Sequence, residues 1–312
     1  MKTLNYKQSQ YKRSEYLIIS SDIFNYDTGS GVFKGKPYPF VLNNNLNNLY
    51  APFGAAILEY FSKNSIAWWN GYLTSHTLSS QVACLNHLFP IRNDKSAVLS
   101  ILSNINPDIV DVLTINSDEF SPAYIQFESV SDIDHLNEKT STRGSNCTSV
   151  DALMLGVHKD GRRILLPIEW KYVEAYGNEN KAVGDPGKTR KSRYENLIDH
   201  SEQLHSTSHD IYYFEPFYQL MRQTLWAEQM ISNKATETVK ADDYIHIHVI
   251  PSENHELLKK IYPCSNNDLE GTWRSCLKDQ NKYRIISPRD LFSSISSNQY
   301  HLLTQYLEKR YW

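Results

Sequence analysis

Three ionisable residues stand near the ends of two apolar runs. Asp151 lies near the start of the first run, SVDALMLGV, and Glu169 and Lys171 close the second, RILLPIEWKY. Between the runs lies Asp160-Gly161, a pair that strongly favours a tight β-hairpin turn. If the turn centres on Asp160, Asp151 and Glu169 face one another on neighbouring strands. A shift of one residue in the register would remove this pairing.

The facing carboxylates predict a metal site. Side chains directly opposite on antiparallel strands have β-carbons ~5 Å apart, so both carboxylates can hold one cation. Strand alternation puts Lys171 on the same face as Glu169. Oxygen ligands suit Mg2+, with Mn2+ as a substitute, and such a cation activates a water that Lys171 can orient toward a phosphodiester. The alternative is a buried carboxylate–lysine ion pair with no catalytic role, which would also compensate charges that are costly to bury.

The elements that carry these residues change type along the chain. Residues 50–105 space their apolar side chains as helices do. Strands and helices then alternate, in this order: short strands within 108–172, a polar glycine-containing loop at 175–194, a helix at 217–231, a strand at 244–251 and a helix at 299–312. This order predicts an α/β fold with a mixed central β-sheet flanked by helices.

Asp151 followed by Glu169-Trp170-Lys171 resembles the D…ExK core of the PD-(D/E)XK (restriction-endonuclease-like) nucleases. Further short motifs, spread over about residues 70–230, are similar to those of a bacterial nuclease-like group of that superfamily. They are Ser79-Ser80-Gln81, Asn86, Phe127-Glu128, Leu136-Asn137-Glu138, Arg143-Gly144, Thr148-Ser149-Val150-Asp151-Ala152, Glu169-Trp170-Lys171-Tyr172 and Tyr218-Gln219-Leu220-Met221-Arg222. Val150 stands where the superfamily often has proline. The resemblance implies a restriction-endonuclease-like core in residues 106–312, with a mainly helical N-terminal region, 1–105, packed on it.

The resemblance also implies an activity, a metal-dependent nuclease in which Asp151 and Glu169 bind Mg2+ and Lys171 positions water. It implies one more glutamate, for which Glu138 is the first choice and Glu128 the second. For Glu138 the alternative is a solvated acid in a polar loop. The implied substrate is nucleic acid, with DNA expected by analogy alone. The rival function is a catalytically inactive nucleic-acid-binding protein that retains the nuclease fold.

Two sets of polar residues are candidate nucleic-acid contacts. The first set crowds the expected loop, where cations could neutralise phosphates, although a solvated flexible loop has the same composition. The second set, Gln219 and Arg222, lies three residues apart on one face of the 217–231 helix. Its side chains either point toward the site or are exposed. The candidates are Lys188, Arg190, Lys191, Arg193, Gln219 and Arg222.

Composition narrows the class of protein. The 312 residues carry a net charge of −3 with a pI of about 6.4, which is unlike a protein that coats DNA non-specifically but fits a nuclease with carboxylates in its site. The start of the chain lacks the apolar run of a secretory signal, and no stretch approaches the ~20 apolar residues of a membrane helix. The four cysteines are scattered, without the close pairs of a zinc site. We expect a cytoplasmic protein without membrane association, either monomeric or homodimeric.

Overall fold

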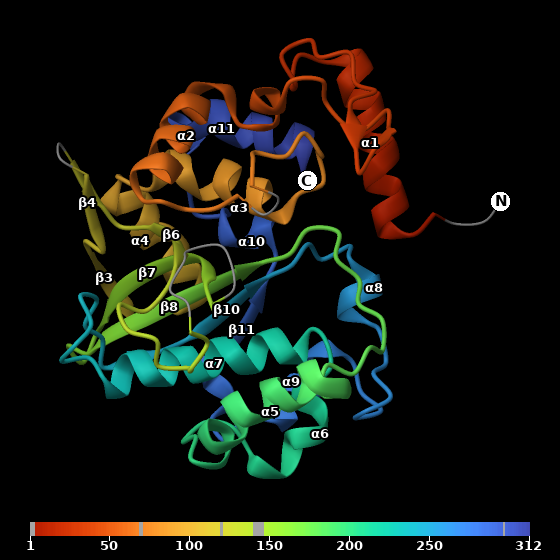
Figure 1. Ribbon diagram of the computed structural model, residues 1–312. Coiled ribbons are helices and arrows are strands. Elements are labelled where there is room, and N and C mark those ends of the chain that lie inside the picture. Colours follow the sequence, from red (N-terminus) through yellow and green to blue (C-terminus); the bar gives the residue numbers. More distant parts are fainter. Residues whose placement is uncertain (1–3, 69–70, 119–120, 140–146, 296) are drawn as a thin grey trace.

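The computed structural model describes residues 4–68, 71–118, 121–139, 147–295 and 297–312. A mixed β-sheet forms its centre (Figure 1). The strands of this sheet are β3 (Ile109–Leu113), β6 (Gln126–Ser129), β7 (Val150–His158), β8 (Arg163–Trp170), β9 (Asp243–Tyr244), β10 (His246–Val249) and β11 (Tyr283–Ile286). Two small hairpins lie apart from it and pair β1 (Val32–Phe33) with β2 (Lys36–Pro37) and β4 (Asn116–Asp118) with β5 (Ser121–Ala123).

The central strands run in the order β11-β10-β8-β7-β3, with β6 also paired to β7 and β9 to β8. β7 is antiparallel to β3, β6 and β8. β8, β9, β10 and β11 pair in parallel. The prediction of a mixed sheet in an α/β fold is confirmed.

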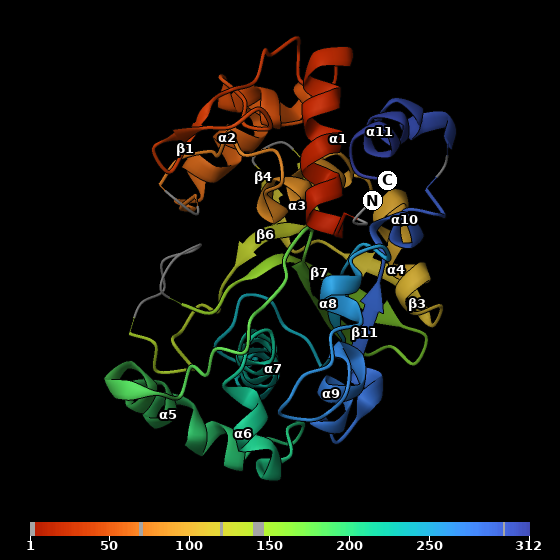
Figure 2. The same ribbon diagram turned by 90° about the vertical axis from the view of Figure 1, so that its right-hand side faces the viewer.

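Helices cover both faces of this sheet (Figures 1 and 2). The α-helices are α1 (Tyr6–Ser20), α2 (Gly54–Lys63), α3 (Ser80–Leu88), α4 (Lys95–Ile105), α5 (Gly184–Asp199), α6 (His209–Tyr212), α7 (Phe217–Ser232), α8 (His255–Leu258), α9 (Leu269–Ser275), α10 (Pro288–Leu291) and α11 (Ser297–Arg310). Short 3-10 helices are η1 (Asn45–Asn48), η2 (Ala51–Phe53), η3 (Phe89–Ile91), η4 (Ser206–Ser208) and η5 (Gln280–Lys282).

The β7–β8 hairpin has the register that the sequence predicts. Its pairs run from Ala152↔Ile168 to Val157↔Arg163, so the strands close symmetrically about Asp160. Gly161 has a φ of +90°, a backbone conformation that glycine adopts without a steric penalty. The Asp-Gly pair therefore predicted both the turn and the register of the two strands on either side of it.

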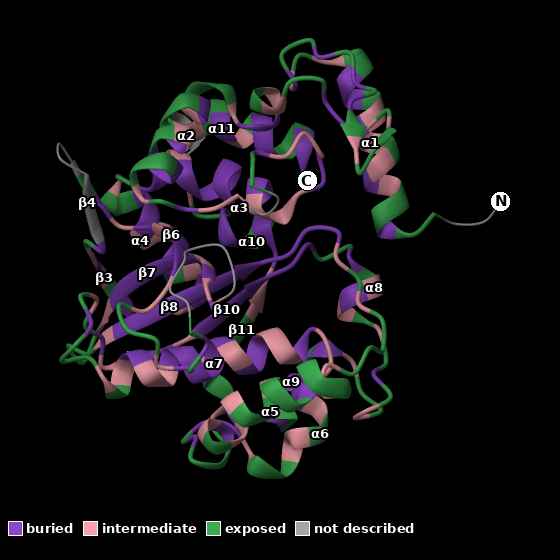
Figure 3. Ribbon diagram, in the orientation of Figure 1, coloured by how far each residue is buried: buried purple, intermediate pink, exposed green. Residues whose placement is uncertain are grey.

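The two faces of the sheet pack into two separate apolar cores. Ala152, Ile168 and Trp170 point into a core that they share with α2, α3, α4 and α11. Leu153 and Leu165, on the other face, pack against α5, α7 and α9. Figure 3 shows the buried strands between these two layers of helices. Alternation therefore places the side chains of Asp151 and Glu169 on the α7 face.

Helices α2 to α4 share the core of the sheet, whereas Leu17 and Ile18 of α1 belong to a small separate cluster. Helices α2 to α4 share one cluster of buried side chains with β7, β8, β10 and the C-terminal α11. The boundary at residue 105 stays a prediction. The Arg143-Gly144 motif of the resemblance lies outside the described residues.

One expected loop is a helix. Residues 188–193 lie within α5, so the prediction of a loop at this position is wrong. Pro186 and Gly187 suggested a loop, but both fall in the first turn of the helix, where proline is tolerated. The residues that follow are mostly good helix formers, and Tyr194 and Ile198 are buried four residues apart on one face.

Candidate active site

Strand pairing brings titratable side chains together in a row across the sheet. The β7–β8 register, carried one step further, places Asp151 opposite Glu169. β6 pairs with β7 on both sides of Glu128, which places Glu128 across from Asp151. His248 of β10 pairs in turn with Glu169. Three carboxylates and an imidazole therefore come from four adjacent strands.

The ionised form of the Asp151 carboxyl group is disfavoured. One of its carboxylate oxygens, Oδ2, accepts a hydrogen bond from the Trp170 N–H at 2.7 Å. Burial, followed by the charges of Glu169 and Glu128, raises the pKa of Asp151 well above its usual range, and Lys171 offsets only part of this. Like charges gathered in this way are compensated when a cation binds among them.

Glu169 and Lys171 form a buried ion pair that α7 reinforces. Lys171 Nζ donates to Glu169 Oε1 and to Gln219 Oε1, each at 2.6 Å. Gln219 Nε2 donates to Glu169 Oε1 at 2.7 Å, and Gln223 Nε2 donates to Glu169 Oε2. The orientation of the Glu169 carboxylate is therefore fixed by one ammonium and two amides.

Lys171 is held in its charged form. Burial alone would lower its pKa, but the Glu169 carboxylate, with further anionic neighbours, raises the pKa well above its usual value. Tyr176 lies 5.7 Å from Nζ, measured to the ring centroid. A protonated lysine donates hydrogen bonds and supplies positive charge, which suits Lys171 to orient a water rather than to deprotonate it.

The residues fit a divalent ion that keeps much of its water. Among the described residues, no group of three or more His, Cys, Asp and Glu side chains is arranged to hold a metal. Asp151 and Glu169 would supply two carboxylates to such an ion and would leave the remaining coordination positions to water. Mg2+ is commonly bound in this way, since it gives up its water reluctantly.

The two candidate glutamates differ in what they contact. Glu138 is buried and accepts hydrogen bonds from the N–H and Oγ1 of Thr148, from Tyr194 OH at 2.5 Å and from Arg222 Nη2 at 2.9 Å. This carboxylate is occupied by holding α5, α7 and residue 148 together. Glu138 is thus not a solvated acid in a polar loop.

Glu128 is instead close enough to Asp151 to raise its pKa. It is buried, accepts a hydrogen bond from Gln81 Nε2 at 2.7 Å and has a φ of +47°, which is uncommon for glutamate. A departure of this kind from ordinary backbone conformation is often found at a functional site. The geometry favours Glu128 over Glu138 as the third carboxylate.

The carboxylates open into a cleft of about 960 Å³ between the N-terminal layer and the α5–α7 layer. Its lining includes Glu128 and eight of the ten candidate residues from the sequence, namely Glu138, Asp151, Glu169, Lys171, Arg190, Arg193, Gln219 and Arg222. Arg190 and Arg193, which lie on α5, are among the eight that line it. Lys188 and Lys191 do not: Lys188 has a side chain that is 82% exposed and pairs with Asp185, and Lys191 lies over the ring of Tyr213.

His246 and His248 are buried beneath α7. Burial, followed by the charge of Lys171, lowers the pKa of both imidazoles, that of His246 to about 3. His248 Nδ1 lies 2.9 Å from Tyr283 OH. Both nitrogens of His246 lack a hydrogen-bond partner within the described part of the chain. These neutral rings border the carboxylates without adding charge.

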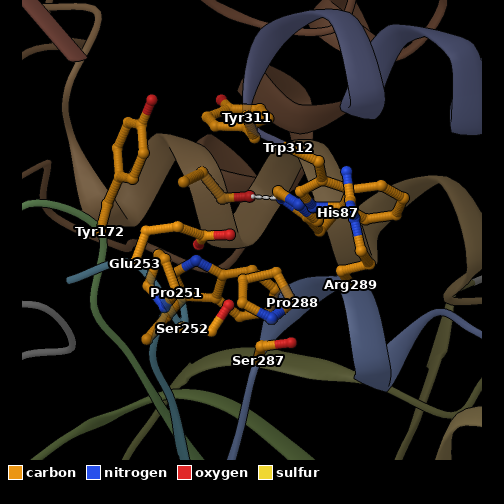
Figure 4. Close-up of a pocket in the computed structure, with 12 residues that line it drawn as sticks. His87, Tyr172, Pro251, Ser252, Glu253, Ser287, Pro288, Arg289, Tyr311 and Trp312 are labelled. Carbon is orange, nitrogen blue, oxygen red and sulfur yellow. Dashed lines mark hydrogen bonds between the residues drawn. The ribbon is translucent and has the colours of Figure 1, made fainter. Parts of the chain in front are cut away.

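A second, much smaller cavity lies on the opposite side of the β8 backbone, beside Trp170 (Figure 4). Its volume is about 20 Å³, which is room for roughly one water. His87 faces it with Nδ1 2.7 Å from the Ala83 carbonyl oxygen, and burial lowers the pKa of this histidine to about 3. The cavity is too small for a substrate, so the large cleft is the candidate active site.

Comparison with known proteins identifies the family of the chain. None of the described helices combines the length and the apolar character needed to cross a bilayer. No curated protein and no solved structure matches the chain. A family model described as "Restriction Endonuclease associating with ARP" matches residues 5–312. Because the match spans nearly the whole sequence, the chain belongs to this restriction endonuclease family.

Proposed function

We propose that the protein is a Mg2+-dependent nuclease of the PD-(D/E)XK type that hydrolyses phosphodiester bonds in DNA, with Mn2+ as a substitute metal. One observation carries the proposal: the register of β7 and β8, continued by one residue, brings Asp151 opposite Glu169, Lys171 Nζ donates to Glu169 Oε1 at 2.6 Å, and all three residues line a large cleft. Membership of a restriction endonuclease family supports DNA as the substrate.

Each charged residue has a role that follows from its contacts. Asp151 and Glu169 hold the metal, which when bound polarises the phosphodiester and makes a coordinated water more acidic. Burial and the charges of Glu169 and Glu128 raise the pKa of Asp151, and a cation bound there would compensate this carboxylate and favour its ionised form. Lys171 orients the attacking water and stabilises the charge that develops on the phosphoryl oxygens.

Glu128 takes the part for which the sequence suggested Glu138. It lies on the Asp151 side of the row, so it can accept the proton that the attacking water loses. Glu138 then acts as a positioning residue that fixes Arg222 and Tyr194 at the cleft wall.

The rival function is a binding protein that holds nucleic acid without cutting it. The observation in its favour is that Lys171 and Glu169 are already satisfied by one another and by Gln219. Against it stands the like-charged pair of half-buried Asp151 and buried Glu128, which a binding surface does not need.

The family name also points to a partner called ARP, and we propose that this chain too works with such a partner.

Cleavage assays separate the two functions. Supercoiled plasmid is incubated with purified protein in Mg2+, Mn2+ or EDTA, with Lys171→Ala and Asp151→Asn as test variants. Lys63→Ala, which removes an exposed ion pair with Glu59 on α2, serves as the control. The proposal predicts metal-dependent cleavage by the wild-type protein and the control, and none by the test variants. Cleavage by all four proteins would indicate a contaminant, and binding without any cleavage would favour the rival function.

A further inference from the structure

The N-terminal side of the cleft is an aromatic wall formed by Tyr11, Phe33, Tyr72 and His76. Phe33 packs edge-on against His76 at 4.8 Å between ring centroids, and Tyr11 meets the same histidine at 6.1 Å. Tyr72 is 63% exposed. Four aromatic side chains therefore border a cleft whose base is charged.

His76 belongs to this wall as a neutral ring. Burial, followed by the charges of Lys7 and Lys34, lowers the pKa of His76 to about 4. Its Nδ1 accepts a hydrogen bond from the Leu78 N–H at 3.2 Å, so the ring carries its hydrogen on Nε2. The wall can therefore offer ring faces, and in addition one N–H donor, to a flat polar ligand.

The opposite wall of the cleft is cationic. It is formed by α5 and α7, which lie on the other side of the strands from α1 and β1 (Figure 2). Arg190 reaches the Lys181 carbonyl oxygen at 2.8 Å and lies over the ring of Tyr218. Arg193 makes no hydrogen bond or ion pair with any described residue, although it is half-buried in the wall. A half-buried guanidinium without a protein partner is suited to bind a phosphate.

We propose that the cleft takes DNA with unpaired nucleotides, with the phosphates on Arg190 and Arg193 and at least one base stacked on the aromatic wall. The inference rests on the proposed function and narrows its substrate class. In a duplex each base covers the faces of its neighbours, so an aromatic side chain reaches a base face only where the strand is single or the base is extruded. One wall is aromatic and the other is cationic, which matches a single strand that has bases along one side and phosphates along the other.

The test measures binding without cleavage. A labelled single-stranded oligonucleotide, the matching duplex and a duplex with a short gap are titrated with the protein in EDTA, and affinity is read by fluorescence anisotropy. The expected order is single strand and gapped duplex tighter than intact duplex. Tyr72→Ala is expected to weaken single-strand binding about tenfold, which is the usual loss for one stacking contact, and to leave duplex binding nearly unchanged.

A matched control isolates the stacking contact. Tyr16 of α1 is 68% exposed, similar to Tyr72, but it does not line the cleft, so Tyr16→Ala should bind as the wild type does. Tyr72→Phe should also retain binding, because it keeps the ring. With 2-aminopurine in the single strand, binding should quench the emission of the base, and Phe33→Ala or Tyr72→Ala should reduce that quenching.

The outcomes separate this inference from the nuclease proposal. Duplex binding as tight as single-strand binding, or affinities and quenching that neither aromatic variant changes, would overturn the inference even if the protein cleaves DNA. Aromatic-dependent binding of single strands by a protein that cleaves nothing would uphold the inference and reject the nuclease.

Discussion

Replacing Asp151 with asparagine should stabilise the metal-free protein. The Asn carbonyl oxygen can still accept the hydrogen bond from the Trp170 N–H, while the charge that Glu169 and Glu128 repel is removed. Because the pKa of Asp151 is raised on folding, the folded protein binds this proton more tightly than the unfolded chain does. The stability that the proton contributes is complete below the unfolded pKa, near ~3.9, and is lost as the pH rises through the raised folded value.

The size of this effect follows from linkage. Each unit by which the folded pKa of Asp151 exceeds the unfolded value costs the ionised protein about 1.4 kcal/mol. For a chain of 312 residues, 1.4 kcal/mol corresponds to about 2 °C in Tm. Because the folded pKa of Asp151 lies well above the unfolded value, we expect Asp151→Asn to raise the Tm in EDTA at pH 8 by a few degrees and to flatten the fall in Tm with rising pH.

Metal should reverse the order of the two proteins. Mn2+ binds the wild-type site, and at a hundredfold excess over Kd it adds about 2.7 kcal/mol of stability, whereas Asp151→Asn lacks a ligand and gains less. Thermal melting from pH 5 to pH 8, with EDTA or Mn2+, measures both effects. Asp22→Asn, at an exposed ion pair with Lys309, is the control. A lower Tm for Asp151→Asn in EDTA, with no Mn2+ shift in the wild type, would mean that Asp151 is a structural ion-pair residue.

Four further variants test the remaining roles. Lys171→Gln should lower the single-turnover cleavage rate by about 10²–10³-fold and leave the Mn2+ shift in Tm intact, whereas loss of that shift would make the lysine a structural part of the metal site. Glu128→Gln should abolish cleavage without lowering the Tm, while Glu138→Gln should destabilise the fold by about 3–5 kcal/mol because it breaks a buried ion pair; the opposite pattern would return the third carboxylate to Glu138. Arg190→Ala should weaken DNA binding and reduce the slope of log K against log salt by about 1, and an unchanged slope would remove Arg190 from the phosphate contacts.

The sequence predicted the part of the site that local signals determine. Asp160-Gly161 fixes a two-stranded unit, and strand alternation then determines which residues share a face with Glu169 and Lys171. Helix 217–231 was equally predictable, because its apolar residues follow the helical period, and α7 spans Phe217–Ser232. The signals for both elements lie within short stretches of sequence, so both can be predicted without knowledge of tertiary contacts.

The position of Glu128 could not be predicted in the same way. β6 reaches β7 through about twenty residues, 130–149, with no turn signal that would set the register. For the extra glutamate the resemblance gave Glu138 as the first choice and Glu128 as the second, and only the contacts of Thr148, Tyr194 and Arg222 show that the Glu138 carboxylate is occupied. Helix α5 was missed because glycine and proline count against a helix everywhere except in its first turn.

The distribution of charge across the row distinguishes a metal site from an ordinary buried ion pair. A structural pair needs only Glu169 and Lys171, and these two already neutralise one another. Asp151 adds a carboxylate on the next strand, and Glu128 adds another beside it, so anionic charge exceeds what Lys171 can balance. That excess lowers the stability of the metal-free fold, and the divalent cation that we propose between Asp151 and Glu169 would compensate it. On the proposed function we therefore expect the stability of this protein to depend on metal.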